Sequence, residues 1–237
     1  MKFPDDCIQQ LFPQWWVKLQ LKKRKRWQLA WAYARHVASH PYEVIIDRRS
    51  APKTHDSINL SVTVFRKDRR DELKPIPVAS IPTYTNEILT INRGKVRPVL
   101  IVATPGTTIP HEIRKNLPEW YSAATYIVVP YFTAMGPEFI KRIKLCEYTQ
   151  CFWDLLPFEE EGHGSILRFD HIQAVEPEIN SLIATEWSLS DNAQEILNDA
   201  LLRHFSQVDF SPTCLAAQAI SKLKEEIKDF HQTANTQ

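Results

Sequence analysis

Short apolar segments rich in β-branched residues fill the middle of the chain, and they constrain its fold more than any other feature. In chain order these segments are Ile88–Ile91, Val99–Ala103, Tyr126–Val129, Ser165–Phe169 and Ile172–Val175. Residues of this kind favour strands, because a branched or aromatic side chain packs well on a pleated surface. The middle of the chain is therefore predicted to form a β-sheet.

The end of the chain has a helical pattern instead. Ser190 is suited to cap a helix, and apolar residues from Ala193 to Leu201 recur three and four positions apart. A second helix is predicted to start at Ser211-Pro212, since proline fits the first turn of a helix. The tail from Gln232 is predicted to be disordered.

The first part of the chain is also predicted to be helical. Pro13 can open a helix, and apolar residues from Trp16 to Val37 recur at roughly helical spacing. His40-Pro41 would end it, because the residue before a proline avoids the helical region. Two short strands, which we expect to form a β-hairpin, then follow at Val44–Ile46 and Ile58–Phe65.

The prolines suggest how the chain is divided. Sixteen prolines against five glycines argue against glycine-rich nucleotide loops and favour extended connections, such as one through Pro75, Pro77 and Pro82. We therefore expect a basic helix and β extension over residues 1–82 and a central domain over residues 83–205. A C-terminal helix and disordered tail would occupy residues 206–237.

Charge is distributed unevenly, although the net charge is only +1. Residues 1–100 carry 19 Lys/Arg and 9 Asp/Glu, and the remainder of the chain is acidic. The densest basic run consists of Lys22, Lys23, Arg24, Lys25 and Arg26. Such a split suggests a basic surface that attracts phosphate, or two halves that attract each other. Two separately solvated faces are the alternative.

The four cysteines do not have the spacing of a metal site or a redox pair. The chain has no Cys-x-x-Cys and no neighbouring Cys/His set, so we expect no metal and no cofactor. The first residues lack the apolar stretch of a signal peptide, and no segment approaches the length that spans a bilayer. We expect a cytoplasmic protein with reduced thiols and no membrane partner.

Four segments, taken in order, resemble toxins of the MazF/PemK family. Asn86–Val102, with its Arg-Pro-Val-Leu, resembles the family's opening strands, and Tyr126–Thr133 resembles its Val-x-Val-x-Pro-x-Thr strand and turn. Ser165–Val175 resembles a later strand, and the helix at 193–201 resembles the closing helix. The resemblance covers about Glu87 to Phe205. It implies an α+β fold, with a small SH3-like bent β-barrel and a C-terminal helix, often dimeric.

The resemblance also implies an activity. Toxins of this family cut single-stranded RNA without a metal, because the 2′-hydroxyl attacks the adjacent phosphorus. Charge then gathers on the phosphoryl oxygens, and a fixed cation lowers the barrier. Arg97 occupies the family's Arg-Pro position, and its planar fork suits phosphate. An antitoxin protein would hold the enzyme inactive.

Other site residues follow from the same resemblance. Phe132 stands where the family usually has threonine, so a bulge would be needed to bring the hydroxyl of Thr133 into the site. His171 is a candidate acid or base near neutral pH. Gln173 stands where the family often has arginine, so phosphate binding there would be weaker.

The RNA-binding surface is predicted from basic residues. Arg93 and Lys95 lie in a loop shorter than the family's long first loop. The basic run Lys22–Arg26, with Trp27 and Trp31 nearby, could compensate with charge and stacking surfaces. Well-packed tryptophans beneath a solvated basic face are the alternative.

Two other functions fit the same residues. A toxin-like barrel without chemistry could bind nucleic acid or a protein, with the N-terminal segment as a docking element. A structural protein of phage or mobile-element origin, its halves joined by opposite charges, is the third possibility.

Overall fold

The computed structural model describes residues 3–20, 24–37, 42–49, 58–64, 90–115, 117, 122–159, 163–176 and 181–234, without the side chains of 45–49, 58–60 and 229–234. The chain forms two compact units. Unit 1 comprises residues 1–33 and 96–237, and unit 2 comprises residues 34–95.

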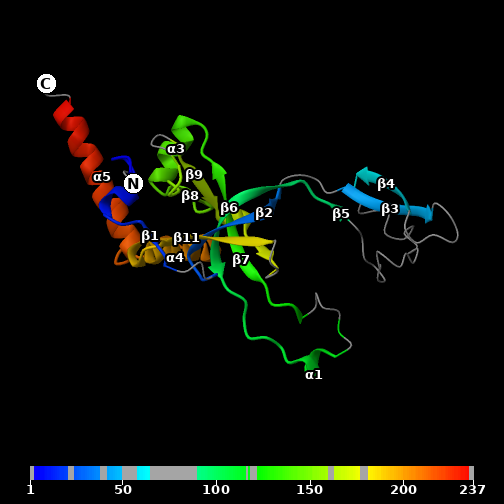
Figure 1. Ribbon diagram of the computed structural model, residues 1–237. Coiled ribbons are helices and arrows are strands. Elements are labelled where there is room, and N and C mark those ends of the chain that lie inside the picture. Colours follow the sequence, from blue (N-terminus) through cyan, green and yellow to red (C-terminus); the bar gives the residue numbers. More distant parts are fainter. Residues whose placement is uncertain are drawn as a thin grey trace. The chain divides into compact units, whose positions relative to one another are not determined.

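Unit 1 is built on a curled antiparallel sheet, a half-barrel, with helices near the C-terminus (Figure 1). Its strands are β1 (Trp16–Lys18), β2 (Gln28–Arg35), β6 (Gly94–Ala103), β7 (Tyr126–Thr133), β8 (Cys151–Asp154), β9 (Ser165–Arg168), β10 (Gln173–Val175) and β11 (Leu182–Leu189). Its α-helices are α1 (His111–Arg114), α3 (Pro137–Lys144), α4 (Asp191–Ser206) and α5 (Leu215–Ala234). Two 3-10 turns, η1 (Ile8–Leu11) and η3 (Phe169–His171), complete the unit.

The strand order places β7 at the centre of the sheet. The path runs β1-β11-β2-β6-β7-β9-β8, and β10 also pairs with β7. β7 therefore has β6 along one edge, whereas β10 and then β9 pair with its other edge. The strands predicted around Val99, Tyr126, Ser165 and Ile172 are confirmed.

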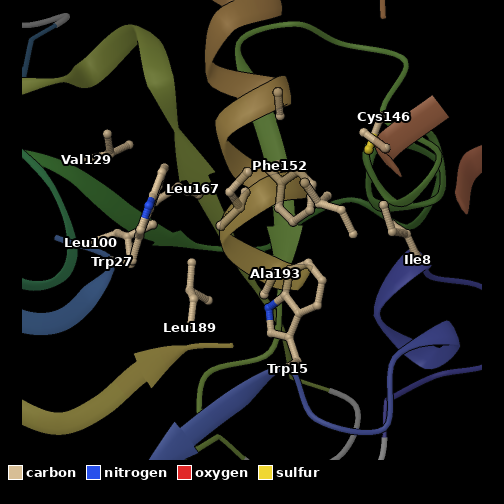
Figure 2. Packing of buried hydrophobic residues seen from close by; sticks show 14 of the residues in the cluster. Ile8, Trp15, Trp27, Leu100, Val129, Cys146, Phe152, Leu167, Leu189 and Ala193 are labelled. Atoms are coloured by element: carbon tan, nitrogen blue, oxygen red, sulfur yellow. The ribbon is translucent and has the colours of Figure 1, made fainter. Parts of the chain in front are cut away.

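The described residues form three hydrophobic cores, and alternation along β7 separates the two largest of them. Val129 and Tyr131 of β7 belong to the larger core, whereas Val128 belongs to a smaller one. Figure 2 shows the larger core, in which Phe152 stacks on Trp15 with ring centroids 6.1 Å apart. Successive residues of a strand point to opposite faces, so the two cores lie on opposite faces of β7.

The C-terminal helices pack on the larger core. Ser190 caps α4 by accepting a hydrogen bond from the Ala193 N–H at 3.4 Å, as predicted. Ile196 and Leu197 are then fully buried one turn later. The second helix begins at Leu215 rather than Ser211, since Ser211–Cys214 form a turn. It continues to Ala234, although disorder was predicted from Gln232 onwards. Residues 235–237 lie outside the described part.

The prediction of an N-terminal helix was wrong. Residues 16–18 and 28–35 form β1 and β2 instead, paired with β11. The alanines of residues 28–35 suggested a helix, because alanine favours helices, although the burial of residues 30–35 alternates with the period of two of a strand. Ala30 and Ala32 are buried, whereas Tyr33 is 54% exposed and Trp31 half-buried. Strand pairing therefore overrode local propensity.

Unit 2 contains a three-stranded sheet with the order β4-β3-β5. β3 (Tyr42–Arg49) and β4 (Ile58–Val64) pair antiparallel, which confirms the predicted hairpin. The segment predicted as Ile88–Ile91 contributes β5 (Thr90–Ile91), which pairs with β3. The remainder of that segment, and the connection through Pro75, Pro77 and Pro82, lie outside the described residues.

The pairing of β5 corrects an assumption about the first loop. β5 does not neighbour β6 in the larger sheet, where the neighbours of β6 are β2 and β7. Lys95, predicted to lie in a loop, belongs to β6, so the connection from β5 to β6 is only Asn92-Arg93. This connection does not join two adjacent strands of the larger sheet. The connection that joins two adjacent strands of that sheet is the one from β2 to β6, and it contains most of unit 2.

Among the elements of unit 1 that were not predicted are the helices α1 and α3 and the strands β8 and β11. All four residues of β8 are buried, so its sequence has no alternation to detect. Within the described residues, no helix combines the length and apolar character needed to cross a membrane.

Gly164 lies so close to the buried ring of Trp153 that a larger residue would not fit without a shift. An added Cβ at this position would lie 2.4 Å from Nε1 of Trp153, whose side chain is buried. Gly164→Ala should therefore force the ring to move and lower the free energy of unfolding by about 1–3 kcal/mol. Urea denaturation measures this change.

Gly106→Ala is the matched control, since no atom lies within 4 Å of an added Cβ there. Equal stability of the two variants would contradict the close approach of Gly164 to Trp153.

Candidate functional site

Arg97 lies on β6 at one end of β7. Val99 and Ile101, two and four residues further on, are fully buried in the smaller core, so Arg97 shares their face of the strand. Val99 pairs with Pro130, and continuing this antiparallel register places Arg97 opposite Phe132. The Arg97 guanidinium carbon lies 4.3 Å from the centroid of the Phe132 ring, a cation–π contact.

Phe132 connects Arg97 to a second group of polar residues. The ring of His171 meets the Phe132 ring edge-on, with centroids 5.1 Å apart and planes at 84°. His171 ends the turn η3, between β9 and β10. The turn therefore brings His171 to the same end of β7 as Arg97.

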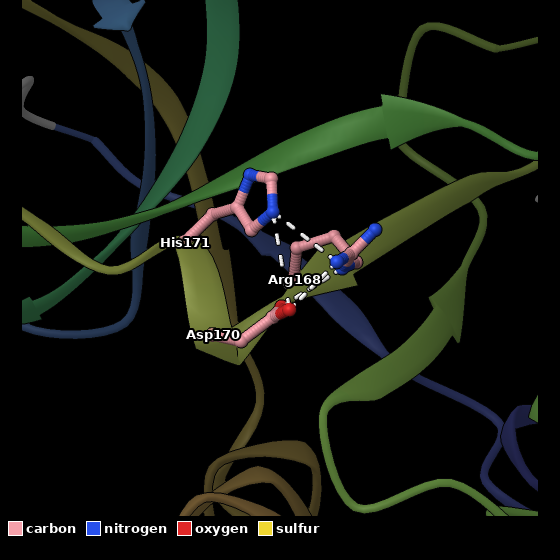
Figure 3. A network of polar contacts seen from close by, with 3 residues as sticks. All are labelled: Arg168, Asp170 and His171. Carbon is pink, nitrogen blue, oxygen red and sulfur yellow. Dashed lines mark hydrogen bonds and ion pairs between the residues drawn. The ribbon is translucent and has the colours of Figure 1, made fainter. Parts of the chain in front are cut away.

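Arg168, Asp170 and His171 form a hydrogen-bonded group in this turn (Figure 3). Arg168 Nε donates to Asp170 Oδ1 at 2.8 Å, and Arg168 Nη2 donates to Asp170 Oδ2 at 2.6 Å. Nη2 also lies 3.1 Å from His171 Nε2. The hydrogen bond to Asp170 raises the pKa of Arg168. Partial burial opposes ionisation of Asp170, but the hydrogen bonds and charge of Arg168 outweigh it and lower the pKa of that carboxyl.

The contact with Arg168 defines the state of the His171 ring. Nε2 lies 3.1 Å from Arg168 Nη2 and 3.9 Å from Asp170 Oδ2. A guanidinium has donors and no acceptor, so a hydrogen bond to Arg168 requires the tautomer that carries its proton on Nδ1. Nδ1 is itself buried, and the side chain is 14% exposed. In this arrangement His171 supports Phe132 and Arg168, and neither ring nitrogen faces solvent as a base.

Thr133 does not share the face of Arg97. It follows Phe132 on β7, and the pairing of Phe132 with Ile166 and of Thr133 with Ser165 continues without a shift. The bulge that would be needed to bring Thr133 into the site is therefore not present in this pairing, and regular alternation directs Thr133 to the opposite face from Phe132. Its side chain is exposed.

Gln173 lies on β10, two residues after His171. It pairs with Val128, and directly opposed residues share a face, so Gln173 belongs to the same face as Val128 and Phe132. It is half-buried and brings no charge.

The predicted basic residues of the N-terminal segment lie in a turn, not on a helix. Arg24, Lys25 and Arg26 fall between β1 and β2. Lys25 and Arg26 are exposed, and Arg24 is half-buried. Lys22 and Lys23 lie outside the described residues.

This basic turn is separate from Arg97. The Arg24 guanidinium lies 5.9 Å from the ring centroid of Tyr126, at the start of β7. Phe132 is six residues further along the strand, which corresponds to ~20 Å. Arg26 stacks at 4.5 Å on Trp27 and bonds to Asn198. Two cationic regions therefore mark the two ends of β7.

Arg93 and Lys95 belong to unit 2 and are exposed. The backbone carbonyl of Arg93 accepts a hydrogen bond from the His36 N–H at 2.7 Å.

Sequence reasoning missed Arg168 and Asp170. Their spacing is common in loops, and the signal that could have identified them is the adjacent His171, itself a candidate acid or base. Phe132 was noted only as a replacement for threonine, whereas it is the ring on which Arg97 and His171 meet.

The described residues contain no cluster of His, Cys, Asp and Glu that could hold a metal ion. The four cysteines are free. Burial raises the pKa of Cys7 and of Cys146 to about 12, so both thiols stay protonated and are poor nucleophiles.

A second polar group lies inside the larger core. The Tyr131 hydroxyl donates to Asp154 Oδ2 at 3.1 Å, and the Leu155 N–H donates to Asp154 Oδ1 at 2.8 Å. Asp154 is fully buried, and this burial raises the pKa of its carboxyl well above the usual value. A buried acid of this kind joins β7 to β8 and has no described route to a ligand.

Comparison with models of known protein families, with curated proteins and with solved structures gave no match. Function is therefore inferred from the fold and the site themselves.

The raised pKa of Asp154 predicts a pH-dependent stability. The folded state keeps the proton at pH values where the unfolded state releases it, so stability is greatest below the unfolded pKa and falls as pH rises through the folded pKa. Within that window the free energy of unfolding falls by at most about 1.4 kcal/mol per pH unit. Asp154→Asn should show a weaker decline in chemical denaturation between pH 5 and 8.

Asp5→Asn makes the same replacement at an exposed position and serves as the control. If Asp154→Asn and the wild type lose stability in parallel as pH rises, the buried carboxyl is not protonated in the native state.

Proposed function

We propose that this protein is an endoribonuclease that cleaves single-stranded RNA without a metal, with Arg97 as the residue that stabilises charge on the reacting phosphate. The observation that carries the proposal is the guanidinium of Arg97, near the start of β6, which lies 4.3 Å from the centroid of the Phe132 ring.

The arrangement of the resembling segments supports this proposal. The segments around Arg97, Tyr126 and Ser165 form β6, β7, β9 and β10, which are neighbours in one curled sheet, and the closing helix corresponds to α4. A half-barrel of this kind is compatible with a small barrel, and the SH3-like form is part of the proposal. With β2 in the place of the first strand, the family's long first loop corresponds to the connection through unit 2, which carries Arg93 and Lys95.

The proposed reaction is a transesterification. The 2′-oxygen forms a bond to phosphorus as its proton leaves, and the bond to the 5′-oxygen breaks as that oxygen gains a proton. The products are a cyclic phosphate and a 5′-hydroxyl. Arg97 would donate two parallel hydrogen bonds to the phosphoryl oxygens, whose charge grows in the transition state.

His171 and Thr133, the groups that would transfer protons, are not positioned for this role as Arg97 is for binding phosphate. His171 could accept a proton at Nε2 only after Arg168 moves away from it. Thr133 belongs to the opposite face of β7 from Phe132. RNA binding would therefore have to rearrange the turn η3, or another group of the RNA complex would have to act as base.

A second candidate function is single-stranded RNA binding without cleavage. The shielded ring nitrogens of His171 and the placement of Thr133 favour it. Phosphate would still bind Arg97, and the exposed basic turn with Lys25 would extend the surface. In either case a protein inhibitor and a homodimer, both implied by the family resemblance, are parts of the proposal.

Cleavage is tested with a long single-stranded RNA in EDTA. The wild type should produce fragments with 5′-hydroxyl ends, and Arg97→Ala should reduce the rate about 100- to 1,000-fold, as expected for a lost donor to an oxyanion. Arg97→Lys should restore little, because lysine lacks the planar fork. Thr133→Ala should cleave at the wild-type rate.

All variants are purified identically, so that a contaminating nuclease would appear equally in each. Cleavage that is unaffected by Arg97→Ala would exclude Arg97 as the catalytic cation. A folded wild type that binds RNA through Arg97 without cutting it would establish the second candidate. Absence of both binding and cleavage would refute the proposal.

A further inference from the structure

Arg168 is held firmly, but from one side only. Asp170 accepts from Nε at 2.8 Å and from Nη2 at 2.6 Å, and His171 Nε2 lies 3.1 Å from Nη2. These contacts use the N–H of Nε and both N–H groups of Nη2. The plane of the guanidinium is therefore fixed before any ligand arrives.

The remaining nitrogen, Nη1, carries two further donors. Among the residues that the structure describes, none accepts a hydrogen bond from it. Figure 3 shows one terminal nitrogen of Arg168 directed away from Asp170 and His171. The side chain is 31% exposed, so a ligand can reach it.

Arg168 also lies on the same face of the sheet as Arg97. Ile166 pairs with Phe132, and Arg168 follows Ile166 by two residues on β9, so all three share a face. The contacts Arg97–Phe132, Phe132–His171 and His171–Arg168 connect the two guanidiniums without a gap.

We infer that Arg168 is a second phosphate ligand of the RNA strand bound at Arg97, pre-set by Asp170 and His171. The inference rests on the proposed function and adds a residue to its binding site. Gln173 has no charge at the position where the resembling family often has arginine, and Arg168 supplies a guanidinium from the turn just before it. The Nη1 donors meet a phosphate oxygen without breaking the bonds to Asp170.

Asp170 has two opposing effects on this site. It removes the rotational freedom that Arg168 would otherwise lose on binding, which favours the complex. Its negative charge, 2.6 Å from Nη2, also cancels part of the attraction for phosphate. Arg168 therefore contributes through directed hydrogen bonds more than through net charge, and its loss should weaken binding about tenfold.

Binding is measured on the full chain with a 2′-O-methyl RNA oligonucleotide, which cannot be cleaved by 2′-oxygen attack. Fluorescence anisotropy at several KCl concentrations gives both the affinity and its salt dependence. Arg168→Gln should weaken binding about tenfold and reduce the slope of log K against log salt by about 0.7, the loss of one phosphate contact on a single strand. Arg168→Lys should weaken binding with little change in slope, because it keeps the charge and loses the fixed fork.

Arg142→Gln is the matched control, since Arg142 is 59% exposed on α3 and its replacement removes the same charge. Thermal melts confirm that each variant is folded. If Arg168→Gln and Arg168→Lys bind as Arg142→Gln does while Arg97→Ala binds weakly, the inference is overturned and the proposed function remains. If the wild type does not bind, the proposed function fails, and the inference fails with it.

Discussion

The pairing of β7 with three other strands is the constraint on which the rest of unit 1 depends. β6 pairs with one edge, and β10 and β9 share the other, so the strand has no free edge along most of its length. Because successive side chains of β7 point to opposite faces of the sheet, its position in the strand decides which face each side chain occupies. Val129 and Tyr131 enter the core beneath α4, Val128 enters the smaller core, and Phe132 reaches the candidate site. A shift of register by one residue would exchange these faces and expose the core.

Two pairs of polar side chains, Tyr131 with Asp154 and Arg168 with Asp170, differ in how far they are buried. Asp154 is fully buried, which raises the pKa of its carboxyl, and it joins β7 to β8 by accepting a hydrogen bond from Tyr131. Arg168 and Asp170 are partly exposed, and each keeps its charge because the other lies beside it. Burial thus makes the first pair a structural element, whereas exposure leaves the second able to meet a charged ligand. His171 is more buried than Asp170, and its Nε2 lies 3.1 Å from Arg168 Nη2.

The parts of the fold that could be predicted were those in which one face of an element meets the core and the other meets water, or in which β-branched residues concentrate. Val99–Ala103 and the capped helix after Ser190 are of this kind. β8 has no such pattern, because all of its residues are buried. For the site, Arg97 and His171 were found from the sequence, and both lie beside Phe132. The position of Thr133 could not be predicted, since one residue decides which face of a strand a side chain occupies.

The sequence by itself determined that the chain has a β-rich middle followed by helices, and that Arg97 shortly precedes the buried residues 99–102 of a strand. These are local properties, set by side-chain shape and by the periodicity of apolar residues. Only the tertiary structure decided that the alanine-rich segment from Gln28 is a strand beside β6, and that Arg168 and His171 gather around Phe132. Both outcomes depend on partners far away in the chain. Hydrogen bonding between strands and the packing of rings are satisfied only when those partners meet, so no local pattern records them.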